Sequence, residues 1–180
     1  GNFAQLGNTR LHYTDQGQGR TIVMIHGLAG NLHNFTYGLA SPLSKNYRVI
    51  CIDRPGCGYS KRASVAKSSL EAQADTIVEL LDHLKIESAI FVGHSLGGAI
   101  ALALAQRHPQ RVQALALIAP LTHSPDEIAT VFKPLDIASP FVRRIIGWTL
   151  AIPATIFRLN TSLKLIFGPD KAPADFAIRG

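Results

Sequence analysis

A single serine set between glycines constrains this chain more than any other feature. The apolar run from Ala89 to Val92 leads into Gly93-x-Ser95-x-Gly97, and a long alanine-rich run follows. A strand that turns into a helix at one residue needs strained backbone angles there, and side chains at the flanking positions would collide, so glycine fits. The pattern therefore predicts a sharp strand-to-helix turn that lifts the Ser95 hydroxyl above the carboxyl end of a strand.

Short apolar runs alternate with helical patterns through the first two thirds of the chain. Such runs suit parallel strands that are covered on both faces, and the alternation predicts a doubly wound, mostly parallel α/β sheet. The turn pair Gly7-Asn8 between two alternating segments predicts an N-terminal antiparallel hairpin. The expected strands are 3–6, 9–14, 21–25, 48–52, 89–92 and a buried strand at 114–119, and the expected helices lie within 34–43, 68–85 and 96–107.

The clearest helix is the segment from Ser68 to Lys85. Ser68 and Glu71 have the spacing of a capping box, and apolar residues recur behind them at helical intervals. From Pro120 onward the pattern changes to helical segments divided by prolines. The sequence thus predicts a core over residues 1–120 and a helical cap segment over residues 121–180, which the chain enters but does not complete.

The composition narrows the choice of partner and compartment. Hydrophobic residues make up 47% of the 180 residues and charged residues 17%, which is typical of a chain with a buried sheet. The net charge is +6, but the basic residues are scattered and not interleaved with aromatic ones, which argues against nucleic acid. Cys51 and Cys57 lack the spacing of metal ligands and are interpreted as free thiols, which favours a cytoplasmic location.

The visible chain shows no signal peptide and no stretch that would span a membrane. Its longest uncharged apolar stretch near the C-terminus, Ile145 to Phe157, is too short to cross a bilayer and contains Pro153. Any leader or anchor would lie outside the visible chain, so membrane association is left open. The oligomeric state is also left open.

Three motifs together resemble a known superfamily. They are His26-Gly27, the segment from Asp53 to Ser60 with the sequence DRPGCGYS, and the serine turn GHSLGG that starts at Gly93. In order and spacing they resemble the α/β-hydrolase superfamily, in its esterase, lipase and perhydrolase-like branch, over Phe3 to about Pro120. The resemblance implies a serine hydrolase that acts on carboxylic esters or related apolar acyl substrates. No metal site and no organic cofactor are expected.

The resemblance also implies roles for individual positions. Ser95 is the expected nucleophile, which forms an acyl-enzyme once a base has taken its proton. The backbone N–H groups of Leu28 and Leu96 are the expected donors of the oxyanion hole. Gly27 and His94, which adjoin these positions, are expected to contact the substrate. The competing interpretation of Ser95 is an ordinary helix N-cap.

Neither histidine near these motifs is the expected general base. His94 occupies an x position of the serine turn, from which its side chain should point away from the hydroxyl, and His26 is expected to hold the following loop by hydrogen bonds. Asp53 is interpreted as a structural residue whose carboxylate binds backbone N–H groups of its turn. The other histidines are interpreted as surface or loop residues: His12, His33, His83, His108 and His123.

The chain does not supply a complete catalytic triad. The superfamily takes its acid from a later strand end and its histidine from near the C-terminus, but no histidine follows His123 here. The leading hypothesis places the acid and histidine beyond Gly180, so that these 180 residues alone hydrolyse little or no p-nitrophenyl ester. The alternative is a non-catalytic binding or partner protein on an incomplete hydrolase scaffold. Amides, lactones, carbon–carbon bonds of diketones and peracid formation stay open alongside esters.

Overall fold

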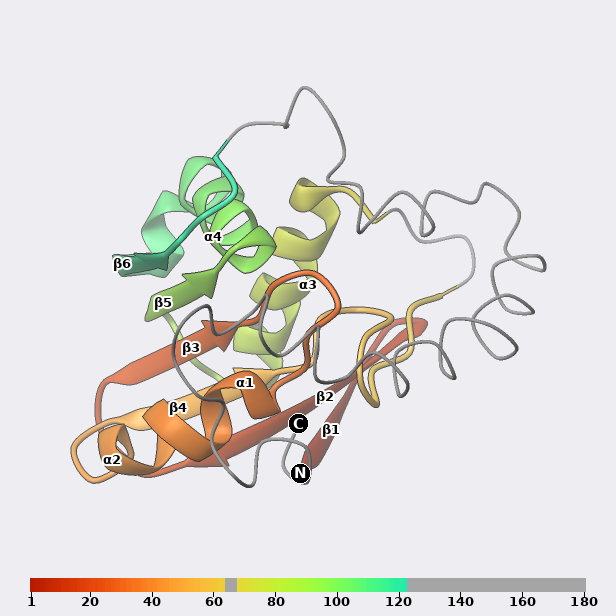
Figure 1. Cartoon of the computed structure of the whole chain (residues 1–180). Coiled ribbons are helices and arrows are strands. Elements are labelled where there is room, and N and C mark those ends of the chain that lie inside the picture. Colours follow the sequence, from red (N-terminus) through yellow and green to blue (C-terminus); the bar gives the residue numbers. More distant parts are fainter. Residues whose placement is uncertain (64–67, 123–180) are drawn as a thin grey trace, which may run out of the picture. The chain divides into compact units, whose positions relative to one another are not determined.

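One mixed sheet of six strands organises the computed structural model, which describes residues 1–63 and 68–122 (Figure 1). The strand order is β1-β2-β4-β3-β5-β6, in which β1, β2 and β4 pair antiparallel and the last four strands are parallel. The predicted hairpin and mostly parallel α/β sheet are confirmed. The strands are β1 (Asn2–Leu6), β2 (Thr9–Gln16), β3 (Thr21–Ile25), β4 (Arg48–Ile52), β5 (Ala89–His94) and β6 (Val112–Ile118).

Helices cover both faces of this sheet. The predicted helix within residues 34–43 is a continuous helical stretch with a π-helical middle, and the predicted helix at 96–107 is observed with those bounds. The helical elements are α1 (His33–Phe35), a π-helical turn (Thr36–Ala40), α2 (Ser41–Leu43), α3 (Leu70–His83), α4 (Leu96–Arg107) and a 3₁₀ turn (Pro109–Arg111).

The two-residue period of the central strands divides the core into two layers. Val23 and Ile25 of β3 belong to the apolar cluster that includes α3 and α4. Ile22 and Met24 of the same strand belong to a second cluster, which includes residues of the helical stretch 33–43. Because successive side chains of a strand point to opposite faces, a continuous apolar run is what a strand covered on both sides requires. All five residues of β3 are buried, as predicted.

The predicted capping box of α3 is wrong by one residue. α3 begins at Leu70, and its N-cap is Ser69, whose hydroxyl accepts a hydrogen bond from the Ala72 N–H at 3.3 Å. Ser68 instead uses its carbonyl oxygen, which accepts a bond from the Gln73 side chain at 3.0 Å. Of two adjacent serines, the one whose backbone adopts the extended conformation of a cap residue becomes the N-cap. The sequence does not indicate which of the two adopts it.

The predicted burial of the strand at 114–119 is also wrong. β6 pairs with β5 and stands at the end of the strand order, and its residues are half-buried or exposed. The apolar run correctly indicated a strand, but burial depends on the neighbours that cover it. Within residues 1–63 and 68–122, no further strand pairs with β6.

The predicted cap segment 121–180 lies outside the described residues, apart from Leu121 and Thr122. The division into a core and a cap therefore stays a prediction. In the part of the chain that the structure describes, no helix combines the length and apolar character needed to cross a membrane.

Candidate active site

Ser95 is the single residue between β5, which ends at His94, and α4, which begins at Leu96. Its backbone angles are φ 51° and ψ −118°, a conformation that residues with a side chain rarely adopt. The Ser95 N–H donates to the Ile118 carbonyl at 3.0 Å, and its own carbonyl accepts from the N–H of Leu121 at 3.0 Å. These bonds hold the strained turn, and the predicted strand-to-helix geometry is confirmed.

The glycines around Ser95 are explained by close backbone approach. A Cβ on Gly93 would lie 2.5 Å from the carbonyl oxygen of Gly97, and a Cβ on Gly97 would overlap the carbonyl oxygen of Ile25 in β3. Either methyl group would push α4 away from the sheet. The glycine frame of the motif therefore follows from how tightly the helix begins against β3 and β5.

The strain at Ser95 predicts an unusual order of stability among its variants. We expect Ser95→Gly to be more stable than Ser95→Ala by about 1 kcal/mol. Glycine enters the positive-φ region without steric strain, whereas alanine retains the strain that its Cβ causes there. Urea denaturation of the two variants measures the difference. Equal stability of the two variants, or a more stable Ser95→Ala, would contradict the strain.

The loop after β3 lies directly against this turn. In the parallel register, Ile25 is level with Gly93, so the residues that follow each strand emerge side by side. A Cβ on Gly27 would lie 3.0 Å from the Cβ of Ser95 and 3.2 Å from Nδ1 of His94. The structure thus brings together Gly27, His94 and Ser95, which the sequence places in separate motifs. That Gly27 and His94 contact a substrate stays a prediction.

Two backbone N–H groups, one in each of these adjoining segments, have no backbone acceptor within the described residues. Leu96 is the first residue of α4, so its N–H has no acceptor within the helix. Leu28 lies in the loop next to Gly27, and 50% of the residue is exposed. Free N–H groups close to a serine hydroxyl are what an oxyanion hole requires, and this role of Leu28 and Leu96 stays a prediction.

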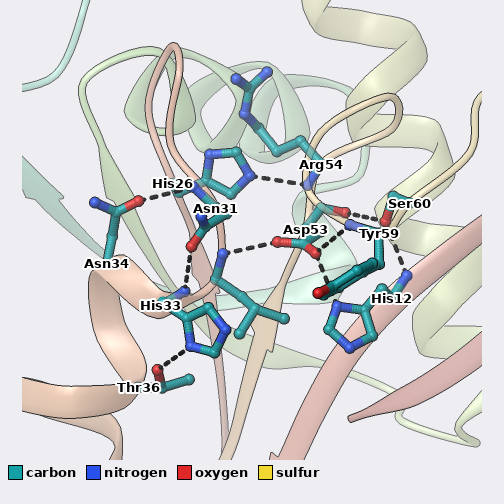
Figure 2. A network of polar contacts seen from close by, with 11 residues as sticks. His12, His26, Asn31, His33, Asn34, Thr36, Asp53, Arg54, Tyr59 and Ser60 are labelled. Carbon is teal, nitrogen blue, oxygen red and sulfur yellow. Dashed lines mark hydrogen bonds and ion pairs between the residues drawn. The ribbon is translucent and has the colours of Figure 1, made fainter. Parts of the chain in front are cut away.

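His26 supports the loop and is not free to act as a base. Its ring is fully buried, Nδ1 lies 2.8 Å from the Gly27 carbonyl oxygen, and Nε2 accepts from the Arg54 N–H at 3.1 Å (Figure 2). Because Nε2 accepts, the proton sits on Nδ1. Burial lowers the pKa of His26 to about 4, so the ring is neutral at pH 7. The predicted hydrogen-bonding role of His26 is confirmed.

Asp53 organises the neighbouring turn, as predicted. Its buried carboxylate accepts from the Leu32 N–H at 2.8 Å through Oδ1 and from the Tyr59 N–H at 2.9 Å through Oδ2. Oδ2 also lies 2.8 Å from Nδ1 of His12 (Figure 2). This carboxylate therefore ties β2, the loop after β3 and the turn after β4 to one another.

The surface assignment of His12 is wrong, because its ring is buried in β2 with 7% of the residue exposed. Alternation with Leu11 and Tyr13 indicated a solvent-facing position, but the turn after β4 covers that face and supplies Asp53 as a partner. Ser60 lies nearby, but its hydroxyl donates to the Asp53 carbonyl at 2.7 Å and accepts from the His12 N–H at 2.8 Å. Ser60, His12 and Asp53 thus form a structural network and not a catalytic triad.

Arg54 is a buried residue that the sequence pattern did not single out. Only 4% of it is exposed, and its guanidinium donates to the Gly27 carbonyl and to the Gln73 side chain, each at 2.9 Å. Arginines are seldom buried without a carboxylate partner, and the motif alone does not indicate burial. Among residues 1–63 and 68–122, no histidine is hydrogen-bonded to the Ser95 hydroxyl.

Comparison with known proteins shows the family of this chain. The family model described as alpha/beta hydrolase fold matches residues 20–162. A 2-hydroxymuconate semialdehyde hydrolase of Pseudomonas sp. (strain CF600) is 45% identical over 112 residues, which are 61% of this chain and 39% of that protein. The dihydrolipoyllysine-residue acetyltransferase component of the acetoin cleaving system of Cupriavidus necator is 38% identical over 120 residues, which are 66% of this chain and 32% of that protein.

Solved structures agree with this result. The meta-cleavage product hydrolase from Pseudomonas fluorescens IP01 is similar with a TM-score of 0.61 and 33% identity, over 67% of this chain and 45% of that one. The enol-lactonase from Burkholderia xenovorans LB400 is similar with a TM-score of 0.59 and 32% identity, over 63% and 45% of the two chains. The chain spans about a third to two fifths of the length of these curated relatives. It belongs to the alpha/beta hydrolase fold family.

Proposed function

We propose that Ser95 is the nucleophile of a serine hydrolase that cleaves carboxylic esters or related acyl substrates. The observation that supports this most directly is the positive-φ turn at Ser95. The N–H groups of Leu96, next to Ser95, and of Leu28, next to Gly27, have no backbone acceptor in the described residues. In the proposed reaction, a base takes the proton of the Ser95 hydroxyl while Oγ attacks the carbonyl carbon, and the two N–H groups bind the resulting oxyanion. The bond to the leaving group then breaks, and the leaving group departs with that proton. Water then hydrolyses the acyl-enzyme.

The general base and its acid are proposed to come from polypeptide outside these 180 residues. His26 is excluded as the base because both ring nitrogens are engaged and its pKa is lowered to about 4. His12 is likewise excluded as the base, because its buried ring is hydrogen-bonded to Asp53. Without a base, binding and the oxyanion hole alone would leave only a small fraction of the catalysed rate.

A second candidate reaction is hydrolysis of a carbon–carbon bond next to a ketone. Similar proteins include a 2-hydroxy-6-oxononadienedioate/2-hydroxy-6-oxononatrienedioate hydrolase, a 2-hydroxy-6-oxo-6-phenylhexa-2,4-dienoate hydrolase and a meta-cleavage product hydrolase, which favours this candidate. An oxyanion hole suits either reaction, because a negative charge develops on the substrate's carbonyl oxygen in both. The apolar acyl or ketone group of a small molecule is the proposed ligand in each case.

Labelling with a fluorophosphonate probe tests the proposed nucleophile. The protein to use is the full-length product of the reading frame that contains these residues, compared with its Ser95→Ala variant and with Ser88→Ala. Ser88 precedes the opposite end of the same strand, and its hydroxyl accepts a hydrogen bond from the Gln113 side chain at 3.0 Å. We expect labelling of the parent and of Ser88→Ala, and a loss of turnover of about 10⁶-fold in Ser95→Ala.

The outcome separates the candidate functions. Persistent labelling in Ser95→Ala would reject Ser95 as the nucleophile, and a folded full-length protein that is not labelled but binds apolar ligands would favour a non-catalytic role. Rates on p-nitrophenyl esters and on a vinylogous diketone then decide between ester and carbon–carbon hydrolysis.

A further inference from the structure

The carbonyl group of Gly27 receives an unusual number of hydrogen bonds. Its oxygen accepts from the Arg54 guanidinium at 2.9 Å, lies 2.8 Å from the protonated Nδ1 of His26, and accepts from the Gly30 N–H at 3.3 Å. A carbonyl oxygen has two lone pairs, so three donors exceed its ordinary capacity. One of the three donors is a charged group, and charge-assisted bonds are the stronger kind.

This carbonyl belongs to the same peptide group as the Leu28 N–H. None of the described peptide bonds is cis, so the N–H of this planar unit points opposite to the carbonyl. The carbonyl points at Arg54 and His26, and the Leu28 N–H therefore points away from both. Turning this peptide over would break all three hydrogen bonds, so its orientation is strongly fixed.

The guanidinium of Arg54 has features that a purely structural hydrogen bond between two segments does not require. In the described part of the chain no carboxylate pairs with it, and its buried Nε has no hydrogen-bond partner. Burial lowers the pKa of Arg54, yet an arginine stays charged in proteins. A full positive charge is thus held in a poorly solvated position, one peptide group away from the proposed oxyanion donor.

We propose that Arg54 is a positioning residue of the oxyanion hole, which orients and polarises the Gly27–Leu28 peptide through the Gly27 carbonyl. Hydrogen bonds along one peptide group reinforce each other, so a carbonyl bound to a cation makes the N–H of the same unit a stronger donor. The Leu28 N–H is thereby strengthened before substrate arrives. His26 is the second support of the carbonyl, and the Arg54 N–H fixes the tautomer that lets His26 donate.

This inference rests on the proposed function, so its test needs one readout that does not depend on turnover. In protein labelled with ¹³C and ¹⁵N, the Gly27 carbonyl and Leu28 amide resonances report the polarisation of this peptide directly. We expect Arg54→Met to move both resonances upfield, and Arg54→Lys to move them less, because lysine keeps a charge but lacks the fork that joins Gly27 and Gln73. Gln73→Met, which removes the other partner of Arg54 together with the bond from Gln73 to the Ser68 carbonyl, is expected to leave them within the change seen for Arg54→Lys.

The second readout is the rate of Ser95 labelling by the fluorophosphonate in the full-length protein. We expect Arg54→Met to lower the maximal inactivation rate by about 10- to 100-fold, which is a smaller effect than that of deleting an oxyanion donor. The probe concentration that gives half of the maximal rate should change less than about two-fold. Arg54→Lys is expected to recover part of the rate. If Arg54→Met does not fold, both measurements are made on Arg54→Lys alone. We expect its resonances and its labelling rate to change in the same direction, by smaller amounts.

The results distinguish this inference from the proposed function. Unmoved Leu28 and Gly27 resonances in a folded Arg54 variant, or a maximal rate within about two-fold of the parent, would overturn the positioning role while leaving Ser95 as the nucleophile. A parent protein that is not labelled would reject the proposed function, and the resonances would still decide whether Arg54 polarises the peptide.

Discussion

Gly97→Ala is expected to destabilise the fold by about 4 kcal/mol or more, which is a large part of the stability of a domain. The added methyl group would overlap the carbonyl oxygen of Ile25 and lie 2.7 Å from that of His26. Both atoms belong to the backbone of β3 and its end, in the middle of the sheet, so they cannot move aside as a flexible side chain would. Urea denaturation followed by circular dichroism, or loss of soluble expression, measures the effect.

Gly38→Ala is the matched control for this substitution. Gly38 lies in the helical stretch between β3 and β4, it is exposed, and a Cβ there would meet no atom within 4 Å. The same change of residue should raise stability by about 0.5–1 kcal/mol, because alanine restricts the unfolded chain and favours helix. Similar effects in the two variants would mean that α4 does not pack as closely on β3 as described.

Asp53→Asn is expected to cost about 3 kcal/mol of folding free energy. An amide can still accept from the Leu32 N–H, but its NH₂ group would then face the Tyr59 N–H, so that two donors oppose each other. The partner of the His12 ring would also lose its charge. Three segments that meet at this carboxylate should loosen together, and the loop that holds Gly27 and Leu28 is one of them.

Asp82→Asn provides the comparison for a carboxylate in water. Asp82 lies on α3 with 62% of its side chain exposed, and it pairs with Arg111 at 2.7 Å. Exposed ion pairs contribute little, so we expect a change within about 0.5 kcal/mol. If Asp53→Asn were as mild as Asp82→Asn, the network around Asp53 would not be holding the loops that carry the site.

The local geometry at Ser95 was predictable because it depends on a few adjacent residues. Small residues on both sides of one serine, between an apolar run and a helical pattern, leave few other ways to fold. The loop after β3 was predictable for the same reason, since small residues follow an apolar run that ends at Ile25. The resemblance to a family then indicated which motifs belong together in one site, and the comparisons confirm that family.

The burial of particular polar residues could not be predicted in this way. The alternation in β2 suggested that His12 faces water, and nothing in the local pattern of Arg54 indicated that it is enclosed. Both are buried because segments distant in sequence cover them: the turn after β4 lies against His12, and Arg54 reaches Gly27 and Gln73. The hydrophobic periodicity of an element indicates which of its faces is apolar, but it does not indicate which other segments pack against the element.

The sequence by itself determined the alternation of strands and helices, the strained turn at Ser95 and the lack of a histidine after His123, because these follow from residue type and spacing along the chain. Only the tertiary structure decided that the loop after β3 lies against that turn, that β6 is exposed, and that Arg54 and His26 meet at the carbonyl of Gly27. The first and last of these features are contacts between segments that the parallel register brings level, and register is a property of the assembled sheet. The exposure of β6 follows from its place at the end of the strand order.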